Sequence, residues 1–84
     1  MNPLVRTATP QPGHRLLLAF DNGETRVFDL TPYLDKGVFR QLQDPADFAK
    51  AAVVAGSVEW PGEVDLSYDT LYLKSLPLAQ TAAA

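Results

Sequence analysis

Residues 15–30 read Arg-Leu-Leu-Leu-Ala-Phe-Asp-Asn-Gly-Glu-Thr-Arg-Val-Phe-Asp-Leu, and this stretch decides the fold class. An apolar run over residues 15–20 and an alternating run over residues 24–30 flank the dipeptide Asn22-Gly23. Asn-Gly in a two-residue loop is the strongest short signal for a β-hairpin, because a type I′ turn needs positive φ at both positions. The stretch therefore predicts a central antiparallel hairpin.

A loop centred on Asn22-Gly23 also predicts a register. It pairs Leu18 with Val27 on one face and Leu17 with Phe28 on the other, so both faces carry apolar pairs. One face must pack on the domain core. The other is expected either to lie under the helical segments of the chain or to be offered to a partner.

Short elements flank the hairpin. Three prolines restrict residues 4–8 to an edge strand, with Val5 and Thr7 on the same face. After the hairpin, Thr31 is expected to cap one helical turn, and Asp44 is expected to cap another. Between them, residues 38–42 form an amphipathic turn, in which positions 38 and 42 share one apolar face.

The second half of the chain predicts another hairpin and one more helix. Strands over residues 51–54 and 57–60 turn at Ala55-Gly56, and Ser67 caps a helix over residues 68–73, followed by an irregular segment. The predicted fold is α+β: a small antiparallel sheet, made of the central hairpin, the second hairpin and the N-terminal edge strand, with short helices. Residues 1–78 are expected to form one domain, and residues 79–84 a disordered tail.

Composition excludes several functions. The chain of 84 residues has no cysteine, so neither disulfides nor thiolate metal sites are available. Its net charge of -3 and its singly scattered basic residues argue against nucleic acid or an anionic membrane as the partner. There is no signal-peptide pattern and no apolar run approaching ~18 residues. A cytoplasmic, bacterial-type protein is expected.

No catalytic constellation is visible. The single histidine, His14, stands beside a turn, where an exposed side chain is expected, and it has no cysteine to activate. The five glycines are isolated, so no phosphate-binding loop is present. The sequence predicts no catalytic residue and no cofactor.

The acidic residues Glu59, Glu63 and Asp65 form a local cluster, with Asp69 nearby. Neighbouring carboxylates bind divalent cations or perform acid–base chemistry. The spacing does not match an EF-hand loop, however, and no histidine joins the group. Glu59 is expected to face solvent, Glu63 to lie on the loop, and Asp65 to bond backbone amides of the turn, so the sequence predicts no metal site. A small-molecule- or metal-binding enzyme that uses this cluster is the alternative.

Trp60 precedes Pro61-Gly62 at the end of a predicted strand. Tryptophan is enriched at interaction hot spots, and tyrosines at interface margins bring a hydroxyl group. Trp60, Pro61, Tyr68 and Tyr72 are therefore the predicted partner contacts. The competing interpretation places Trp60 half-buried under the loop that follows it.

Four pieces of sequence occur in a fixed order: Phe20-Asp21-Asn22-Gly23-Glu24 with Phe28-Asp29-Leu30; Gly37-Val38-Phe39 with Leu42; Asp44-Pro45 with Phe48; and Val58-Glu59-Trp60-Pro61-Gly62 running into Asp65-Leu66 and Leu71-Tyr72. The ordered set resembles a small bacterial domain of unknown function catalogued as family 2442, over about residues 4–73. The family often has proline where this chain has Tyr68, which affects the start of the last helix.

The resemblance implies a compact α+β domain with no established activity. Some larger relatives carry an added helix-turn-helix segment, and members are commonly encoded beside another small protein in an arrangement that looks like a toxin–antitoxin pair. We therefore predict a non-enzymatic protein-interaction module that binds a protein partner and, in one version, itself. An antitoxin-like partner of a neighbouring small protein is the specific form. A further alternative is an accessory or sensor domain of a transcriptional regulator without its DNA-binding part.

Overall fold

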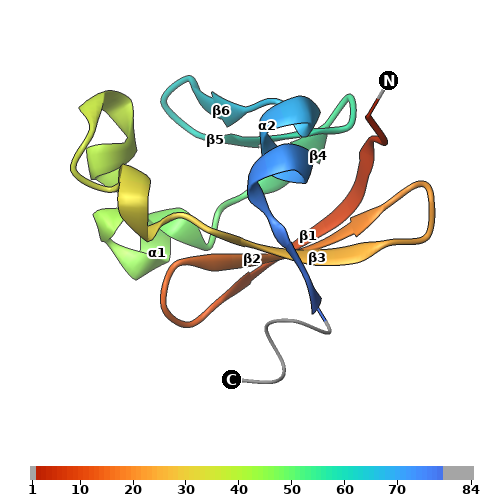
Figure 1. Cartoon of the computed structure of the whole chain (residues 1–84). Helices are drawn as coiled ribbons and strands as arrows, with labels where there is room; N and C mark the ends of the chain where they lie inside the picture. Colours follow the sequence, from red (N-terminus) through yellow and green to blue (C-terminus); the bar gives the residue numbers. More distant parts are fainter. Residues whose placement is uncertain (1, 79–84) are drawn as a thin grey trace.

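The computed structural model describes residues 2–78, whose strands form two antiparallel sheets (Figure 1). The larger sheet has the order β1-β2-β3-β7, with strands β1 (Val5–Gln11), β2 (Arg15–Phe20), β3 (Thr25–Asp29) and β7 (Leu76–Pro77). The smaller sheet has the order β4-β5-β6, with strands β4 (Ala52–Val54), β5 (Ser57–Trp60) and β6 (Val64–Leu66). The helical segments are the 3₁₀ helices η1 (Thr31–Tyr33) and η2 (Gly37–Gln43) and the α-helices α1 (Pro45–Phe48) and α2 (Tyr68–Lys74). The α+β class is confirmed, but the two hairpins that were predicted to share one sheet lie in separate sheets. The predicted tail at 79–84 lies outside the described residues.

The core lies between the two sheets. Alternate residues of each strand point inward, as the period of two in a strand requires. The larger sheet contributes Val5, Leu16, Leu18, Phe20 and Phe28, and the smaller sheet contributes Val58, Trp60, Val64 and Leu66. Leu30, Leu42, Phe48 and Leu71 complete the buried cluster from the helices and connections. Helix α2 contacts both β3 and β5, so it joins the two sheets at one side (Figure 1).

The register of the central hairpin differs from the predicted one. Phe20 pairs with Glu24 across a three-residue loop, in which the Gly23 amide donates to the Phe20 carbonyl at 3.1 Å. Of the three loop residues 21–23, only Gly23 has a positive φ, of 89°, as a type I turn followed by a bulged glycine requires. The predicted two-residue turn is therefore wrong. Asp21 stays in the loop because its backbone amide and its carboxylate both bond to the backbone of Leu4.

This shift of one residue decides which side chains face the core. Leu16 pairs with Phe28 on the inner face, and Leu17 pairs with Val27 on the outer face. The predicted register would have placed Phe28 opposite Leu17 instead. Leu16, Leu18, Phe20 and Phe28 therefore share one face, which the smaller sheet and the helices cover, whereas Leu17 and Val27 face outward.

The predicted edge strand is confirmed in β1, which extends further than expected. Its register shifts between Val5 and Thr7, so a bulge places these two residues on opposite faces. Val5 is buried and Thr7 is exposed, which corrects the predicted shared face. Pro10 is tolerated within the strand because β1 lies at the edge of the larger sheet.

Two helix predictions were wrong in detail. Thr31 lies inside η1 rather than capping it, and its amide and hydroxyl groups both donate to a carboxylate oxygen of Asp29. In η2, Leu42 is buried, whereas Val38 is 57% exposed. Residues three apart eclipse one another in a 3₁₀ helix, so Phe39 rather than Val38 shares the inner face with Leu42. The predicted Asp44 cap is confirmed, since its carboxylate accepts a hydrogen bond from Ala46 at 2.9 Å.

The second hairpin and the Ser67 cap are confirmed. Ala55 and Gly56 form the two-residue turn, with φ values of 51° and 82°. Ser67 Oγ accepts the backbone amide of Thr70 at 3.3 Å, and α2 follows. Two short strands were not predicted: β6 pairs with β5, and β7 pairs with β3 in the segment expected to be irregular.

Candidate functional site

Trp60 lies in the core rather than on the surface. Its side chain is only 3% exposed, its Nε1 donates to the Phe48 carbonyl at 2.9 Å, and its ring stacks on Phe48. Pro61, the next predicted contact, is exposed, and its carbonyl accepts a hydrogen bond from Gln41. Of this pair, only Pro61 offers its side chain to a partner.

The two predicted tyrosine contacts are half-buried. The backbone amide of Tyr68 donates to Ser57 Oγ at 3.0 Å, which ties the start of α2 to β5. The hydroxyl of Tyr72 donates to Glu24 at 2.6 Å. The side chain of Tyr72 is thus already engaged within the domain, whereas the contact of Tyr68 is made by its backbone. Contact of either tyrosine with a partner stays a prediction.

The acidic cluster does not assemble into a metal site. Glu59 and Asp65 lie directly opposite each other across β5 and β6, on the solvent side of the smaller sheet, and Glu63 is exposed in the turn between them. The prediction that Asp65 bonds the amides of the turn is wrong, because Asp65 lies within strand β6 and its side chain faces solvent. Like charges placed directly opposite destabilise a strand pair. Within residues 2–78, no three potential ligands among His, Asp and Glu gather closely enough to hold an ion. The geometry gives the metal-dependent alternative no support.

A polar network that sequence reasoning missed joins β3 to α2. Arg26 donates through Nε to Ser75 Oγ at 2.8 Å, through Nη2 to the Ser75 carbonyl at 2.7 Å, and through Nη1 to Glu24 at 3.1 Å. Its guanidinium lies 4.6 Å from the centre of the Tyr72 ring. The hydrogen bond from Tyr72, followed by that from Asn22, holds the pKa of Glu24 below its ordinary value of 4.5. The same bond to Glu24 raises the pKa of Tyr72 above 10.0.

This network fixes the last helix on the sheet. Ser75 is 3% exposed and bonds back to the Tyr72 carbonyl, so the polar groups around Arg26 are satisfied within the domain. A fully satisfied cluster is suited to holding elements together rather than to reacting with a substrate. The sequence around Ser75 gives no signal that its hydroxyl bonds to Arg26, which lies 49 positions earlier in the chain.

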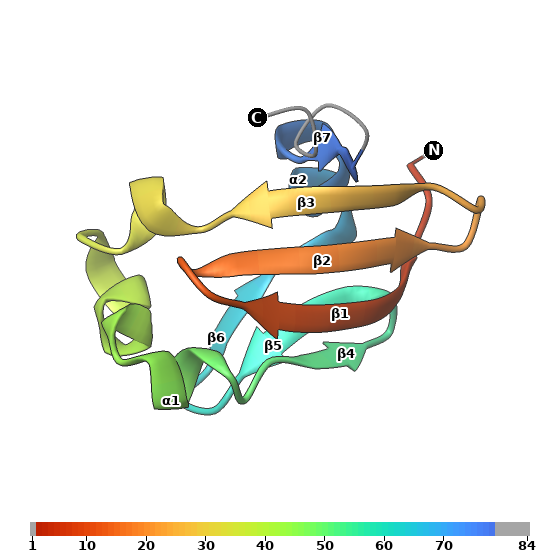
Figure 2. The ribbon, with the colours of Figure 1, turned by 90° about the horizontal axis from the view of Figure 1, so that it is seen from below.

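The outer face of the larger sheet is the first candidate interaction surface. We use this name for the apolar side chains of Leu17, Ala19, Val27 and Leu76. Leu17 pairs with Val27, which pairs in turn with Leu76, so the three form a row across adjacent strands. Figure 2 looks onto this face, and no helix or strand of residues 2–78 lies over it. Within the described residues, the uncovered face of the central hairpin is therefore the one that carries Leu17 and Val27.

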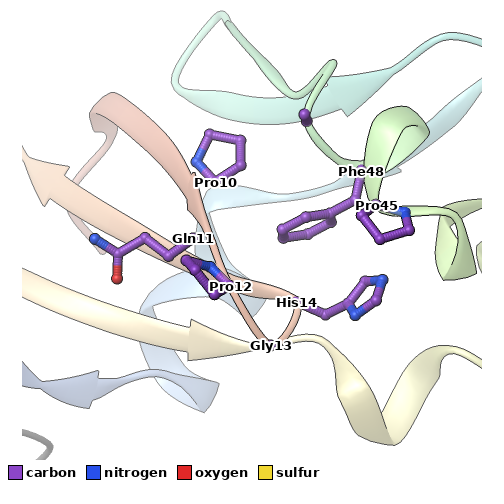
Figure 3. Close-up of a pocket in the computed structure, with 8 residues that line it drawn as sticks. Pro10, Gln11, Pro12, Gly13, His14, Pro45 and Phe48 are labelled. Atoms are coloured by element: carbon purple, nitrogen blue, oxygen red, sulfur yellow. The ribbon is translucent and has the colours of Figure 1, made fainter.

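A pocket of about 420 Å³ is the second candidate. It lies between the turn that joins β1 to β2 and the helix α1 (Figure 3). Pro10 and Pro12 stand on one side, and Phe48, Pro45 and His14 stand on the other (Figure 3). The remaining lining residues are Gln11, Gly13 and Ala49. No aspartate, glutamate, lysine or arginine lines this pocket, which we call the proline pocket.

His14 is half-buried rather than exposed, which corrects the prediction for this residue. Its Nε2 lies 3.1 Å from the Gln43 carbonyl, and its ring centre lies 5.1 Å from that of Phe48. Its backbone has φ of 58°, in the left-handed region, and its carbonyl accepts the Leu30 amide. The sequence does not predict these contacts, because the partners of His14, Gln43 and Phe48, lie about 30 positions further along the chain.

These features define a small α+β domain with an uncovered sheet face and a proline-lined pocket. The family model described as Protein of unknown function (DUF2442) matches residues 5–77, and the chain belongs to this family. No curated protein and no solved structure is significantly similar to it. Over residues 2–78, no helix is both long enough and apolar enough to cross a membrane.

Proposed function

We propose that this domain is a non-enzymatic protein-interaction module that binds a small protein partner through the outer face. The observation that carries the proposal is the row formed by Leu17, Val27 and Leu76, which no element of residues 2–78 covers. Burial of apolar surface is the main favourable term in most protein association. A partner that covers this row gains that term without rearranging the core.

The surroundings of the row are suited to an interface. Leu76 is 54% exposed, whereas Leu16 on the opposite face of the same sheet is fully buried. Arg15 and Asp29, a cross-strand pair, stand at one end of the face, and Thr25 stands near the other. An apolar centre with a polar, charged rim is the usual anatomy of a specific interface.

The specific form of the proposal is an antitoxin-like complex. The partner is then the small protein encoded beside this one, in the arrangement that the family resemblance implies. The net charge of -3 favours a partner with a basic rim, because complementary charge speeds encounter and fixes orientation. A homodimer through the same face is the version in which the domain binds itself.

Co-expression with the product of the neighbouring gene tests the proposal. We expect a complex that survives copurification with the wild-type domain and is lost with Leu17→Lys or Val27→Lys, because each lysine places a charge in the apolar row. Val54→Lys is the matched control, since Val54 is a 46% exposed strand residue of the smaller sheet. Circular dichroism checks that all variants are folded.

Three outcomes would contradict this assignment. The first is a wild-type domain that forms no complex and remains monomeric at high concentration. The second is a complex that tolerates both lysine variants. The third is equal loss of binding in Val54→Lys. A wild-type dimer that Leu17→Lys converts to a monomer supports the self-binding version.

A further inference from the structure

We propose that a second copy of this chain occupies the outer face, in a dimer whose two-fold axis runs along the seam between β2 and β3. The inference rests on the proposed function, because it assigns an occupant to the same surface. The dimer is the form of the domain in the absence of the small protein partner, which competes with the second copy for the outer face. The charges at one end of the face select both this occupant and the axis.

Arg15 is an unpaired cation on the outer face. Its side chain is exposed, and its guanidinium makes neither a hydrogen bond nor an ion pair within residues 2–78. Asp29 lies directly opposite on β3, but its Oδ1 already accepts the amide and the hydroxyl of Thr31, at 3.0 and 2.8 Å. The Asp29 carboxylate is thus held by the start of η1 and not by Arg15. Both charges remain available to a molecule that covers the face.

The outer face is complementary to itself about the seam. Its three cross-strand pairs are Arg15 with Asp29, Leu17 with Val27, and Ala19 with Thr25. A two-fold axis along the seam exchanges the two strands, so each residue of a pair lies over the other residue of that pair in the second copy. Arg15 then lies over Asp29 of the second copy, and symmetry repeats this ion pair. The apolar pair meets its own counterpart in the centre.

Other axes lose this match. An axis along β2 would place Arg15 over Arg15 of the second copy, and an axis along β3 would place Asp29 over Asp29. An axis across the strands, through the row of Leu17 and Val27, would place Arg15 over Ala19 and leave the charges without counter-charges. Like charges that face each other across an interface strongly oppose binding. The charge pattern therefore selects the seam axis.

The geometry of sheet packing fits this arrangement. Sheets that pack face to face lie about 10 Å apart and keep their strand directions within about 30° of each other. An extended arginine side chain and an aspartate side chain together bridge that gap. Figure 2 shows β2 in the middle of the face, between β1 and β3, and no helix of residues 2–78 obstructs a second sheet. Two copies thus form a sandwich of two larger sheets.

The same axis covers the exposed Leu76, which pairs with Val27 and is 54% exposed. Thr9 pairs with Leu17, so Thr9 and Leu76 occupy the same row on opposite sides of the seam. The two-fold axis places Leu76 over Thr9 of the second copy, where the threonine methyl group offers an apolar contact. The apolar row is then covered along its whole length.

Sedimentation velocity over a range of protein concentrations tests the dimer. We expect the wild type to dimerise, and Arg15→Asp or Asp29→Arg to weaken dimerisation roughly tenfold or more, because each change places two pairs of like charges in the interface. Arg40→Asp is the matched control for Arg15→Asp. Arg40 is exposed on η2 rather than on the larger sheet, and its substitution changes the net charge equally, so dimerisation should be unaffected. Circular dichroism checks that every variant is folded.

Mixing the two charge variants tests the axis. In a mixed dimer about the seam, the aspartate introduced into one chain faces the arginine introduced into the other, and the native Asp29 faces the native Arg15. We therefore expect an equimolar mixture to dimerise about as tightly as the wild type, with native mass spectrometry identifying the mixed dimer by its mass. A change in the stability of either chain cannot explain this rescue, because each chain carries the same substitution alone and in the mixture.

A second pair of variants avoids Asp29, whose substitution deprives Thr31 of its acceptor. The seam axis places Ala19 over Thr25 of the second copy at the other end of the face. A mixture of Ala19→Glu and Thr25→Lys should therefore form the mixed dimer in preference to either homodimer. This pair decides the question if Asp29→Arg does not fold.

The inference is overturned if the wild type stays monomeric at high concentration, if Arg15→Asp dimerises as the wild type does, or if folded charge variants form no mixed dimer. A monomeric wild type that still copurifies with the neighbouring gene product, and loses it in Leu17→Lys, refutes the dimer and leaves the proposed function standing. Rescue by mixing, together with no binding of the neighbouring product, supports the dimer and contradicts the antitoxin-like form.

Discussion

At Gly56 the fold leaves no room for a side chain. A Cβ atom at this position would lie 2.8 Å from both Cβ and Cδ2 of Leu4, and the backbone has φ of 82°. The Gly56 carbonyl also accepts the Val5 amide at 2.9 Å. Gly56 thus lets β1 approach the second hairpin, which connects the two sheets at one end.

Gly56→Ala and Gly23→Ala form a matched pair, because Gly23 has a similar φ of 89° but open space around it. Gly23→Ala should lower the free energy of unfolding by about 1 kcal/mol through the left-handed backbone alone. Gly56→Ala should lower it by about 1–3 kcal/mol more, through the clash with Leu4. Urea denaturation of both variants measures the difference. Equal losses would show that Leu4 moves aside freely.

Glu24 gives a pH-dependent prediction. Its folded pKa lies below the ordinary value of 4.5, with the Tyr72 hydroxyl as the largest cause. Because the pKa of Glu24 is lower in the folded than in the unfolded state, ionised Glu24 stabilises the domain at pH values above its unfolded-state pKa. This contribution is lost as the pH falls through the folded-state pKa. The stability difference between wild type and Glu24→Gln should therefore shrink below about pH 4.5.

Tyr72→Phe supplies the check on that assignment. Removing the hydroxyl should raise the pKa of Glu24 toward 4.5, as followed by NMR titration of the carboxyl carbon. In the wild type, the hydrogen bond to Glu24 raises the pKa of Tyr72 above 10.0. The stability that this shift contributes is therefore complete below pH 10.0 and is lost as the pH rises through the folded-state pKa of Tyr72. An unchanged Glu24 titration in Tyr72→Phe would contradict the assigned cause.

Among the elements, the short helix α2 depends on its N-cap, Ser67. It has seven residues, and it carries Leu71 into the core and Tyr72 into the network with Arg26. A helix this short has little intrinsic stability, so tertiary packing and capping must hold it.

Ser67→Ala should lower the free energy of unfolding by about 1 kcal/mol, because the Thr70 amide loses its acceptor. Ser67→Asp should restore most of that loss, since aspartate is an equally good N-cap. Thermal unfolding followed by circular dichroism compares the three proteins. If Ser67→Ala is as stable as wild type, packing of Leu71 alone fixes the start of the helix.

The elements also show what the sequence could predict. Caps and turns depend on neighbouring residues, so Asp44, Ser67 and the turn at Ala55-Gly56 were predicted correctly. The hairpin register depends on Leu4, which bonds to Asp21 from 17 positions away. Strands of two or three residues, such as β6 and β7, carry no periodic signal of their own and exist because a partner strand is already in place.

The candidate sites follow the same division. The Asn-Gly hairpin indicated an apolar face for a partner, but only the observed register identifies that face as the one with Leu17 and Val27. The proline pocket could not be predicted, because residues 10–14 and 45–49 meet only through the packing of α1 against the β1–β2 turn. Trp60 was predicted as a partner contact because the sequence does not show that its ring packs against Phe48, 12 positions earlier.

At the scale of the whole molecule, one core supports both sheets, and Trp60 is its largest member from the smaller sheet. A domain of 84 residues buries only about 60–70% of its unfolded surface, so its stability margin is small. Damage to this core should therefore affect every element.

Trp60→Phe should lower the free energy of unfolding by about 2–3 kcal/mol, because it leaves a void and deprives the Phe48 carbonyl of its donor. Tyr68→Phe, at a half-buried aromatic position, should change it by less than about 0.5 kcal/mol. Urea denaturation followed by circular dichroism suits both variants. A loss in Trp60→Phe no larger than that in Tyr68→Phe would show that the void closes and the carbonyl finds another donor.

The stacking of Trp60 on Phe48 gives the domain an optical reporter. Trp60 is the single tryptophan of the chain, so all indole fluorescence comes from this residue. Its ring stacks on Phe48, which also lines the proline pocket. A molecule that enters the proline pocket should alter that emission, because Phe48 both lines the pocket and contacts Trp60. A partner seated on the outer face, across the larger sheet, should leave it unchanged. One unlabelled spectroscopic signal can thus assign a ligand to one surface or the other.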